Sequence, residues 1–251
     1  MTGQGTDYDG VPADALARAL DVPRVAVYAA VPSTLDVAHR LAEAGAEAGT
    51  VIVADRQTAG RGRAGRRWSS PPGGGVWLTV IERPADAAAL EVLSLRLGLR
   101  ARRALQPLAA GEVQVKWPND LYVDGGKLGG ILVEARWRDG AVDWVAVGVG
   151  VNVTPPPEPP GARGLAPDAR RADVLGALVA AVRSSSEALG PLRPAEVREF
   201  DRHHVAQGRR CTAPTPGTVE GVSAAGALLV RDDAGAVRAC TSGSLVLESV
   251  P

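Results

Sequence analysis

Residues 145–153 read Val-Ala-Val-Gly-Val-Gly-Val-Asn-Val, and this stretch determines how the chain around it has to fold. Valine alternates with smaller or polar residues, which is the period of two expected of a β-strand. One face of this strand is apolar, whereas the other carries Ala146, Gly148, Gly150 and Asn152. The bare face could form the floor of a ligand cavity with Asn152 as its polar group, or it could allow a helix to pack closely.

Several short strands are predicted directly before this one. The connections between them contain Asp124-Gly125-Gly126 and Arg138-Asp139-Gly140, which are typical of tight turns. Tight turns join antiparallel neighbours, so these strands should form one mainly antiparallel sheet. The strands are expected at residues 113–116, 121–123, 130–135 and 142–153.

The N-terminal part supplies further strands and a capped helix. Ser33-Thr34-Leu35-Asp36 has the spacing of a capping box, so Ser33 should begin a helix that runs to about Gly45. Leucine and alanine recur at helical spacing over residues 86–109, which predicts the longest amphipathic helix of the chain. The remaining strands are expected at 25–31, 51–54 and 75–81, and the remaining helices at 12–20 and 172–189.

The C-terminal part has a different composition. A proline-rich loop covers residues 154–167, and from residue 207 onward short apolar runs alternate with glycine turns, which suits a small β-barrel without helices. We therefore expect a main domain over residues 1–206 and a small domain over 207–251. Helices grouped beside a mixed, mainly antiparallel sheet indicate an α+β fold.

Composition excludes several classes of protein. The chain has 28 basic and 28 acidic residues, so no global charge would draw it onto nucleic acid or a membrane surface. It has neither a signal-like start nor a run long enough to span a bilayer, so a cytoplasmic location is expected. Cys211 and Cys240 should be reduced structural thiols, and the adjacent His203 and His204 should be polar surface residues rather than metal ligands.

Residues 54–68 form the segment with the densest chemical signal. They hold five arginines against one carboxylate, together with Gly60, Gly62 and Gly65. Guanidinium groups and accessible backbone amides suit phosphate or carboxylate oxygens, and such a loop should become ordered only when an anion binds. The glycines also spell a dinucleotide-binding fingerprint, but Pro71 and Pro72 follow where that fingerprint needs a helix.

Two further segments carry groups suited to a bound anion. In Lys116-Trp117-Pro118-Asn119-Asp120, the proline interrupts regular strand pairing, so Asn119 and Asp120 should project from a strand end. A carboxylate there could hold Mg²⁺ or a ribose hydroxyl, although the segment could also be a plain turn. Lys127 is followed by Gly129 and Gly130, which leave room for its side chain to lie over a ligand.

Together these segments resemble the hallmarks of the biotin protein ligases. The segments that match the family pattern, in order and spacing, are Gly60 to Trp68, Lys116 to Asp120, Lys127 to Glu134 and Gly148 to Val153. The likeness covers the chain from Ser33 onward, with Leu35 standing where many relatives have asparagine. It implies a catalytic domain related to class II aminoacyl-tRNA synthetases and lipoate ligases, followed by an SH3-like barrel.

The resemblance also implies roles for individual residues. Those expected to bind biotin are Ser33, Thr34, Gln57, Gly60, Arg61, Gly62, Arg63, Lys127 and Gly129. Those expected to bind ATP or the adenylate are Arg61, Arg63, Trp68, Asn119, Asp120, Lys127 and Asn152. Catalysis is expected of Arg63, Lys116, Asp120 and Lys127, with Mg²⁺ held at Asp120.

The implied enzyme is a biotin--[biotin carboxyl-carrier protein] ligase. It would use ATP and Mg²⁺ to form biotinyl-5'-AMP and would then biotinylate a lysine of the carrier protein of a biotin-dependent carboxylase. Joining two anions requires cations, which the arginines and lysines supply. The short polar N-terminus favours the form without a DNA-binding domain, as a monomer or homodimer with no nucleic-acid or membrane partner.

Two alternatives remain open. A lipoate or octanoate ligase on the same fold would need a wider, more apolar pocket and no contact from Gln57 to a ureido ring. A nucleic-acid-binding module would grip phosphates with the arginine loop and single strands with the barrel. The chain has few aromatic residues and none between the arginines, which makes base stacking poor.

Overall fold

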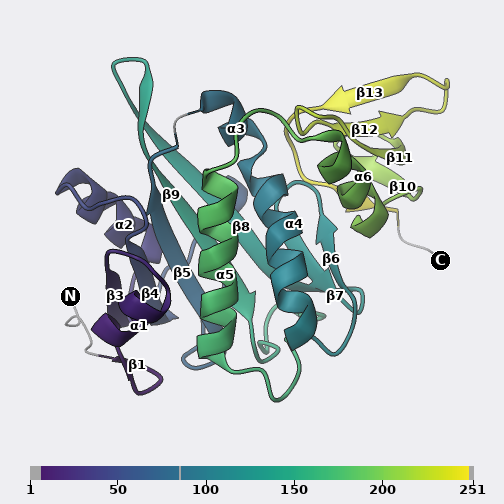
Figure 1. Ribbon diagram of the computed structural model, residues 1–251. Coiled ribbons are helices and arrows are strands. Elements are labelled where there is room, and N and C mark those ends of the chain that lie inside the picture. The colour runs from purple at the N-terminus through teal and green to yellow at the C-terminus, as the bar shows by residue number, and fades with distance from the viewer. Residues whose placement is uncertain (1–6, 85, 249–251) are drawn as a thin grey trace.

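A seven-stranded sheet forms the centre of the computed structural model, which describes residues 7–84 and 86–248 (Figure 1). The strand order is β3-β4-β5-β9-β8-β7-β6. Only β3 and β4 of this sheet pair in parallel, so the predicted mixed, mainly antiparallel sheet is confirmed. Its strands are β3 Val25–Val31, β4 Val51–Gln57, β5 Gly75–Glu82, β6 Val113–Lys116, β7 Asp120–Val123, β8 Gly126–Arg138 and β9 Ala141–Asn152.

The two turn sequences form hairpins as predicted. Asp124 and Gly125 have φ of 47° and 70°, and Asp139 and Gly140 have φ of 51° and 79°. Two successive residues in the left-handed region match the twist of antiparallel strands in a two-residue turn. These turns set β7, β8 and β9 side by side, with Gly130 opposite Gly150 in the register.

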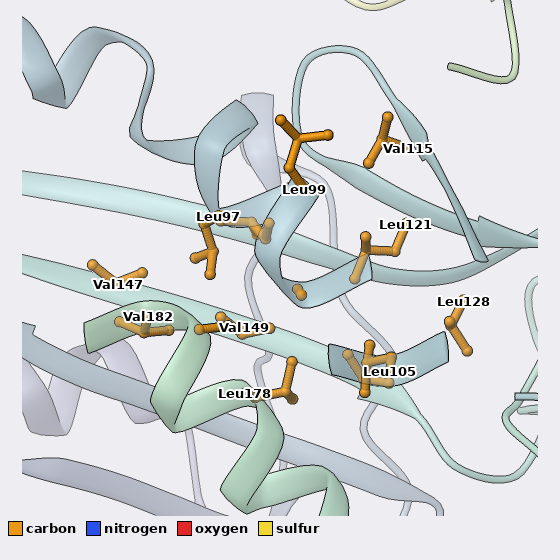
Figure 2. Close-up of a cluster of buried hydrophobic side chains, with 14 of the residues drawn as sticks. Leu97, Leu99, Leu105, Val115, Leu121, Leu128, Val147, Val149, Leu178 and Val182 are labelled. Carbon is orange, nitrogen blue, oxygen red and sulfur yellow. The ribbon is translucent and has the colours of Figure 1, made fainter. Parts of the chain in front are cut away.

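Helices cover both faces of the sheet. α4 Leu93–Leu105 and α5 Arg171–Ser186 lie over one face (Figure 1). Their leucines pack with Val147 and Val149 of β9 in the buried cluster that Figure 2 shows. α2 Thr34–Glu43 covers the other face, where Ala146 joins its core. The alternation along β9 therefore separates an apolar core from a face with little side-chain bulk.

The long helix expected over residues 86–109 is interrupted, so that prediction was wrong. Residues Ala87–Glu91 form α3, and α4 begins only at Leu93. Val92 between them has φ of −106° and ψ of 2° and is fully buried, so its packing takes precedence over helical geometry. α4 ends in a 3₁₀ turn at Gln106–Leu108, where Pro107 lacks the amide that an α-helical bond would need.

One helix lies in a segment for which no element was predicted. α6 Pro194–His203 begins with proline at its first position, and the Glu196 carboxylate accepts the backbone amide of Arg193 at 2.8 Å. Proline followed two residues later by glutamate is a helix-start signal that the sequence contains. Buried Arg96 of α4 pairs with Glu196 at 3.0 Å and holds α6 against the main core.

The C-terminal part forms a small antiparallel sheet, as expected for an SH3-like barrel. The strand order is β13-β12-β11-β10-β14, and no helix occurs within residues 207–248. A boundary at residues 206 and 207 stays a prediction, and the outer ends of both predicted domains lie outside the described residues. The strands are β10 Arg210–Ala213, β11 Gly217–Val222, β12 Leu228–Arg231, β13 Val237–Cys240 and β14 Val246–Leu247.

The described N-terminal residues form a short hairpin and a helix beside β3 (Figure 1). These elements are β1 Asp7–Tyr8, β2 Val11–Pro12 and α1 Ala13–Ala19. Across residues 7–84 and 86–248, no helix has the length and apolar character needed to cross a membrane.

Candidate active site

A cavity of about 330 Å³ lies on the face of the sheet that carries α2. It is lined by the start of α2, the end of β4, the Gly/Arg loop (residues 58–68), the turn before β7, and the glycine-bearing face of β9. Residues 243–245 of the C-terminal part close one side. Segments between residues 33 and 245 that are distant in sequence therefore meet at one cavity.

One end of the cavity is a hydrogen-bonded polar cluster. The Gln57 side-chain oxygen accepts from the backbone amide of Thr34 at 2.9 Å and from its hydroxyl at 3.2 Å. The Gln57 amide donates to Ser70 at 2.9 Å, and Thr79 donates to Thr34 at 2.8 Å. Ser33 caps α2, as predicted, by accepting from the Leu35 amide. This end offers both donors and acceptors in a fixed arrangement.

The middle of the cavity is apolar and floored by glycine. A Cβ at Gly148 would lie 3.2 Å from the Leu35 side chain, so β9 and α2 approach closely at this point. Ile131 and Leu132 also line this part. Both interpretations of the bare face of β9 therefore hold, because it packs against α2 and also lines the cavity.

The cations of the cavity gather around Asp120. Lys127 Nζ lies 2.7 Å from Asp120 Oδ1 and 5.3 Å from the centre of the Trp68 ring. Arg63 and Lys116 line the same cavity, and burial lowers the pKa of both, while Asp120 opposes that shift. Partly desolvated cations favour an incoming anion, because they have lost part of their hydration.

Trp68 covers the floor beside these cations. A Cβ at Gly150 would lie 2.6 Å from the indole nitrogen, so only glycine leaves room for this ring. Trp68 also meets Trp77 edge to face at 6.3 Å. The indole nitrogen is buried and has no hydrogen-bond partner among the described residues. It is a free donor directed at the cavity floor.

The Gly/Arg loop folds over the cavity. Its hairpin is closed by the Gly62 amide bonding the Arg66 carbonyl at 2.7 Å, with Ala64 and Gly65 in the left-handed region. Arg61 pairs with carboxylates of α2 and β8, and Arg66 donates to Ser244 at 2.7 Å. Arg63 has no carboxylate within ion-pairing distance in residues 7–84 and 86–248. Ordering of this loop on ligand binding stays a prediction.

The turn at Lys116–Asp120 is held from two sides. His204 Nε2 accepts the backbone amide of Trp117 at 3.1 Å, and the Trp117 indole donates to the Gly226 carbonyl at 3.0 Å. Asn119 donates to the Ile131 carbonyl at 2.6 Å and fixes the turn to β8. Asp120 is therefore presented to the cavity on a rigid support.

His204 is buried, so the prediction of two surface histidines was wrong for this residue. It follows α6 directly and bridges to Val115 of β6, which places its ring under the turn. Burial lowers the pKa of His204 to about 3, and nearby Lys116 acts in the same direction. Its ring is therefore a neutral acceptor. His203 is partly buried and contacts Glu112 at 3.0 Å.

Comparison with known proteins identifies the family. Residues 27–152 match the family model described as Biotin/lipoate A/B protein ligase family. A biotin--[acetyl-CoA-carboxylase] ligase of Paracoccus denitrificans is 34% identical over 204 residues, which cover 73% of this chain and 85% of that protein. The chain belongs to this ligase family.

A solved ligase structure matches the fold at nearly full length. Biotin protein ligase from Aquifex aeolicus, in complex with biotin and ATP, matches 90% of this chain and 99% of its own, with 26% identity and a TM-score of 0.72. The bifunctional ligase/repressor BirA of Bacillus subtilis is 40% identical over 126 residues. The match spans only 39% of that repressor's length. The predicted α+β ligase fold is thus confirmed.

The cavity brings together most of the residues expected from the resemblance to the ligases. Those that line it are Ser33, Thr34, Gln57, Arg61, Gly62, Arg63, Trp68, Lys116, Asn119, Asp120, Lys127 and Asn152. Gly60 and Gly129 do not line it. A Cβ at Gly60 would lie 2.6 Å from the Trp68 carbonyl, and one at Gly129 2.8 Å from the Gly150 carbonyl. These two glycines allow backbone segments to approach each other.

Sequence reasoning missed two parts of the site. Ser70 and Thr79 complete the polar cluster around Gln57, and no local motif distinguishes them. Gly243, Ser244 and Leu245 reach the cavity from the C-terminal sheet, far from the other motifs in sequence. Only the tertiary structure could indicate that contact.

Asp120 was predicted to hold Mg²⁺, and the carboxylates around the cavity can be compared with what that ion requires. No group of three or more His, Cys, Asp or Glu side chains suited to a metal occurs in the described part of the chain. Asp120 is nevertheless a single carboxylate at the cationic end of the cavity. Mg²⁺ in nucleotide sites is commonly held by one or two carboxylates, with substrate phosphates and water as the other ligands. Asp120 fits that mode.

Proposed function

We propose that this chain is an ATP-dependent biotin protein ligase, which makes biotinyl-5'-AMP and then biotinylates a lysine of a carrier protein. The observation that carries the proposal is that one cavity is lined both by the polar groups of Thr34 and Gln57 and by Arg63, Lys116 and Lys127. A small molecule with a polar ring and a carboxylate tail fits that combination. The named relatives and the Aquifex complex with biotin and ATP support the same activity.

Biotin would lie with its ureido ring at the polar cluster. Ser33, Thr34 and Gln57 would offer donors and acceptors to this ring, while Leu35 and Ile131 would contact its apolar chain. The carboxylate would then reach Lys127. A lipoyl group has no ureido ring to form hydrogen bonds with this polar cluster, so it would gain fewer favourable contacts there than biotin.

In the first step, a biotin carboxylate oxygen attacks the α-phosphorus of ATP. A new P–O bond forms, the bond from the α-phosphorus to the bridging oxygen breaks, and pyrophosphate leaves with the electron pair. Arg63 and Lys127 would offset the repulsion between the two anions and stabilise charge in the transition state. Asp120 would hold Mg²⁺, which supplies charge neutralisation for the phosphates.

In the second step, the acceptor lysine amine attacks the acyl carbon of the mixed anhydride. An amide bond forms, AMP leaves with the electron pair of the acyl C–O bond, and the amine loses a proton. The Gly/Arg loop over the cavity would keep water from attacking first. A carboxylase carrier domain as acceptor, a cytoplasmic location and a monomeric or dimeric state belong to the same proposal.

Direct detection of the adenylate tests this function. The chain is incubated with ATP, Mg²⁺ and biotin, passed through a desalting column, and the retained small molecules are measured by mass spectrometry. We expect stoichiometric biotinyl-5'-AMP, and biotin transfer when a carrier domain is added. Lipoate and octanoate in parallel reactions should give far less adenylate. Equal or greater lipoyl-adenylate would favour the lipoate alternative, and no adenylate from any acid would refute ligase activity.

A further inference from the structure

Arg61 differs from the other cations at the cavity because its charge is already neutralised by two carboxylates. Its Nη2 lies 3.0 Å from Asp36 Oδ1 and 3.1 Å from Glu134 Oε2. These carboxylates come from α2 and β8, so the Gly/Arg loop is tied to two separate elements. An incoming anion would therefore meet a guanidinium whose charge is already compensated by protein carboxylates.

Glu134 is itself held in place by a chain of hydrogen bonds that leads from the partly exposed Glu134 and His39 to buried Trp144. Its Oε2 also meets His39 Nε2 at 2.8 Å, and the Trp144 indole donates to His39 Nδ1 at 3.0 Å. An indole nitrogen can only donate, so Nδ1 accepts and the His39 proton lies on Nε2, facing Glu134. Trp144 is 2% exposed and cannot easily move. The anchor for Arg61 is therefore fixed to the core of the sheet.

We propose that Asp36, His39 and Glu134 are positioning residues that hold the Gly/Arg loop over the cavity through Arg61. The four arginines of this loop, at 61, 63, 66 and 67, repel one another, and this anchor neutralises one of those charges without a ligand. It leaves Arg63, two residues further on, to meet the substrate anions. The catalytic part of this inference rests on the proposed ligase function.

The anchor determines what fraction of ligand-free molecules already has the loop closed, and so how much free energy ligand binding must supply to close it. If the closed loop is only partly populated, the apparent affinity for a ligand falls by that fraction. Removing a carboxylate should shift the loop toward open conformations and weaken ligand binding, while the chemistry after closure stays the same. A direct ligand role for Arg61 predicts the opposite, because loss of a competing carboxylate would free the guanidinium and tighten binding.

Limited trypsin digestion of the ligand-free full chain tests the anchor without any assumption about activity. Trypsin cleaves after the arginines at 61, 63, 66 and 67, so the cleavage rate in this loop reports how often it opens. Partly exposed ion pairs predict a rate about 3-fold higher for Glu134→Gln or Asp36→Asn and about 10-fold higher for the double variant. Glu43→Gln, a carboxylate on α2 that lies 3.9 Å from Arg136, is the matched control and should match wild type.

A second readout separates positioning from general damage. In adenylate formation, the double variant should raise the KM for biotin about 10-fold and change kcat less than about 2-fold, with thermal stability close to that of Glu43→Gln. If trypsin cleaved the loop of the double variant at the wild-type rate, or if the KM of this variant for biotin fell, the proposed anchoring role would be wrong. If cleavage rises as expected but no variant, wild type included, makes an adenylate, the anchor stands and the proposed function fails.

Discussion

Lys127 and Asp120 neutralise each other in the ligand-free chain at 2.7 Å. Both face the cavity, together with Arg63. An incoming phosphate and a divalent cation would exchange partners with this pair, the phosphate taking Lys127 and the cation taking Asp120. Before ligand binds, each of these two charged groups therefore has a partner, and on binding each can exchange that partner for a ligand group of the same charge.

Loss of either main cation should impair the first half-reaction. Lys127→Ala and Arg63→Ala are each expected to slow adenylate formation about 100-fold, because each would remove charge stabilisation from the transition state. Arg136→Ala on the exposed part of β8 is the control and should retain wild-type rates. Circular dichroism and melting temperatures should be unchanged in all three. A rate within a few-fold of wild type for Lys127→Ala would contradict its assigned role.

Sequence reasoning located most of these side chains but not what each one contacts. Arginine and lysine spacing indicated an anion site, and Arg63, Lys116 and Lys127 do line one cavity. Nothing in the loop sequence distinguishes Arg61, whose carboxylate partners lie 25 residues before it and 73 residues after it. Partners this distant depend on the register of sheet and helix, which a single sequence does not reveal.

At the scale of elements, β9 connects the core to the site. Its valines pack under α4 and α5, while Gly148 and Gly150 face the cavity. The strict alternation fixes this arrangement, because a shift by one residue would exchange the two faces. The position of the cavity floor is thus set by the pattern that defines the strand.

Gly150→Ala should disturb this floor selectively. The added methyl would lie 2.6 Å from the Trp68 indole nitrogen and would push the ring toward the cavity. We expect ATP affinity to fall about 10-fold, a cost typical of overpacking. Gly130→Ala is the control: it lies opposite Gly150 in the register, and its methyl would contact Trp68 at an ordinary 3.5 Å. Isothermal titration measures both, and equal affinities would contradict the role of this contact.

Strands were easier to predict than helices for a physical reason. Period-two alternation and Asp-Gly turns depend on neighbouring residues, so β3, β6 and both hairpins were found. The interruption at Val92 depends on tertiary packing, and the helical spacing of leucines continues across it. α6 has a local start signal in the sequence, because Pro194 occupies its first position and Glu196 follows two residues later.

At the scale of the whole molecule, the C-terminal sheet is part of the site. Ser244 accepts from Arg66, residues 243–245 line the cavity, and the Gly226 carbonyl holds Trp117. The sequence predicted a small separate barrel but gave no indication that it would complete the cavity. Contacts between segments distant in sequence therefore complete the site.

The free energy of unfolding should depend on pH through two buried titratable groups, Glu82 and His204, which act in opposite directions. Burial raises the pKa of Glu82 from 4.5 to about 7, against the effect of Arg183. The folded chain then holds a proton that the unfolded chain releases, so this contribution to stability is full below pH 4.5 and is lost as pH rises to about 7. The pKa of His204 falls from 6.5 to about 3, so its contribution is full above pH 6.5 and is lost as pH falls.

Single substitutions separate the two effects. Relative to wild type, Glu82→Gln should gain unfolding free energy as pH rises from 4.5 to 7, by up to about 3 kcal/mol. His204→Gln should gain unfolding free energy relative to wild type as pH falls below 6.5. Urea unfolding at a series of pH values measures both. Differences from wild type that do not vary with pH would show that these groups do not titrate in this way.

The central claim is that cations from separate segments converge on one cavity where two anions are joined. Calorimetric binding of a non-hydrolysable biotinyl-adenylate analogue to wild type, Arg63→Ala and Lys127→Ala tests it most directly. We predict tight binding by wild type and a loss of about 100-fold for each variant, typical of a buried charge-assisted contact. Wild-type affinity in both variants, or no binding by wild type, would contradict the claim.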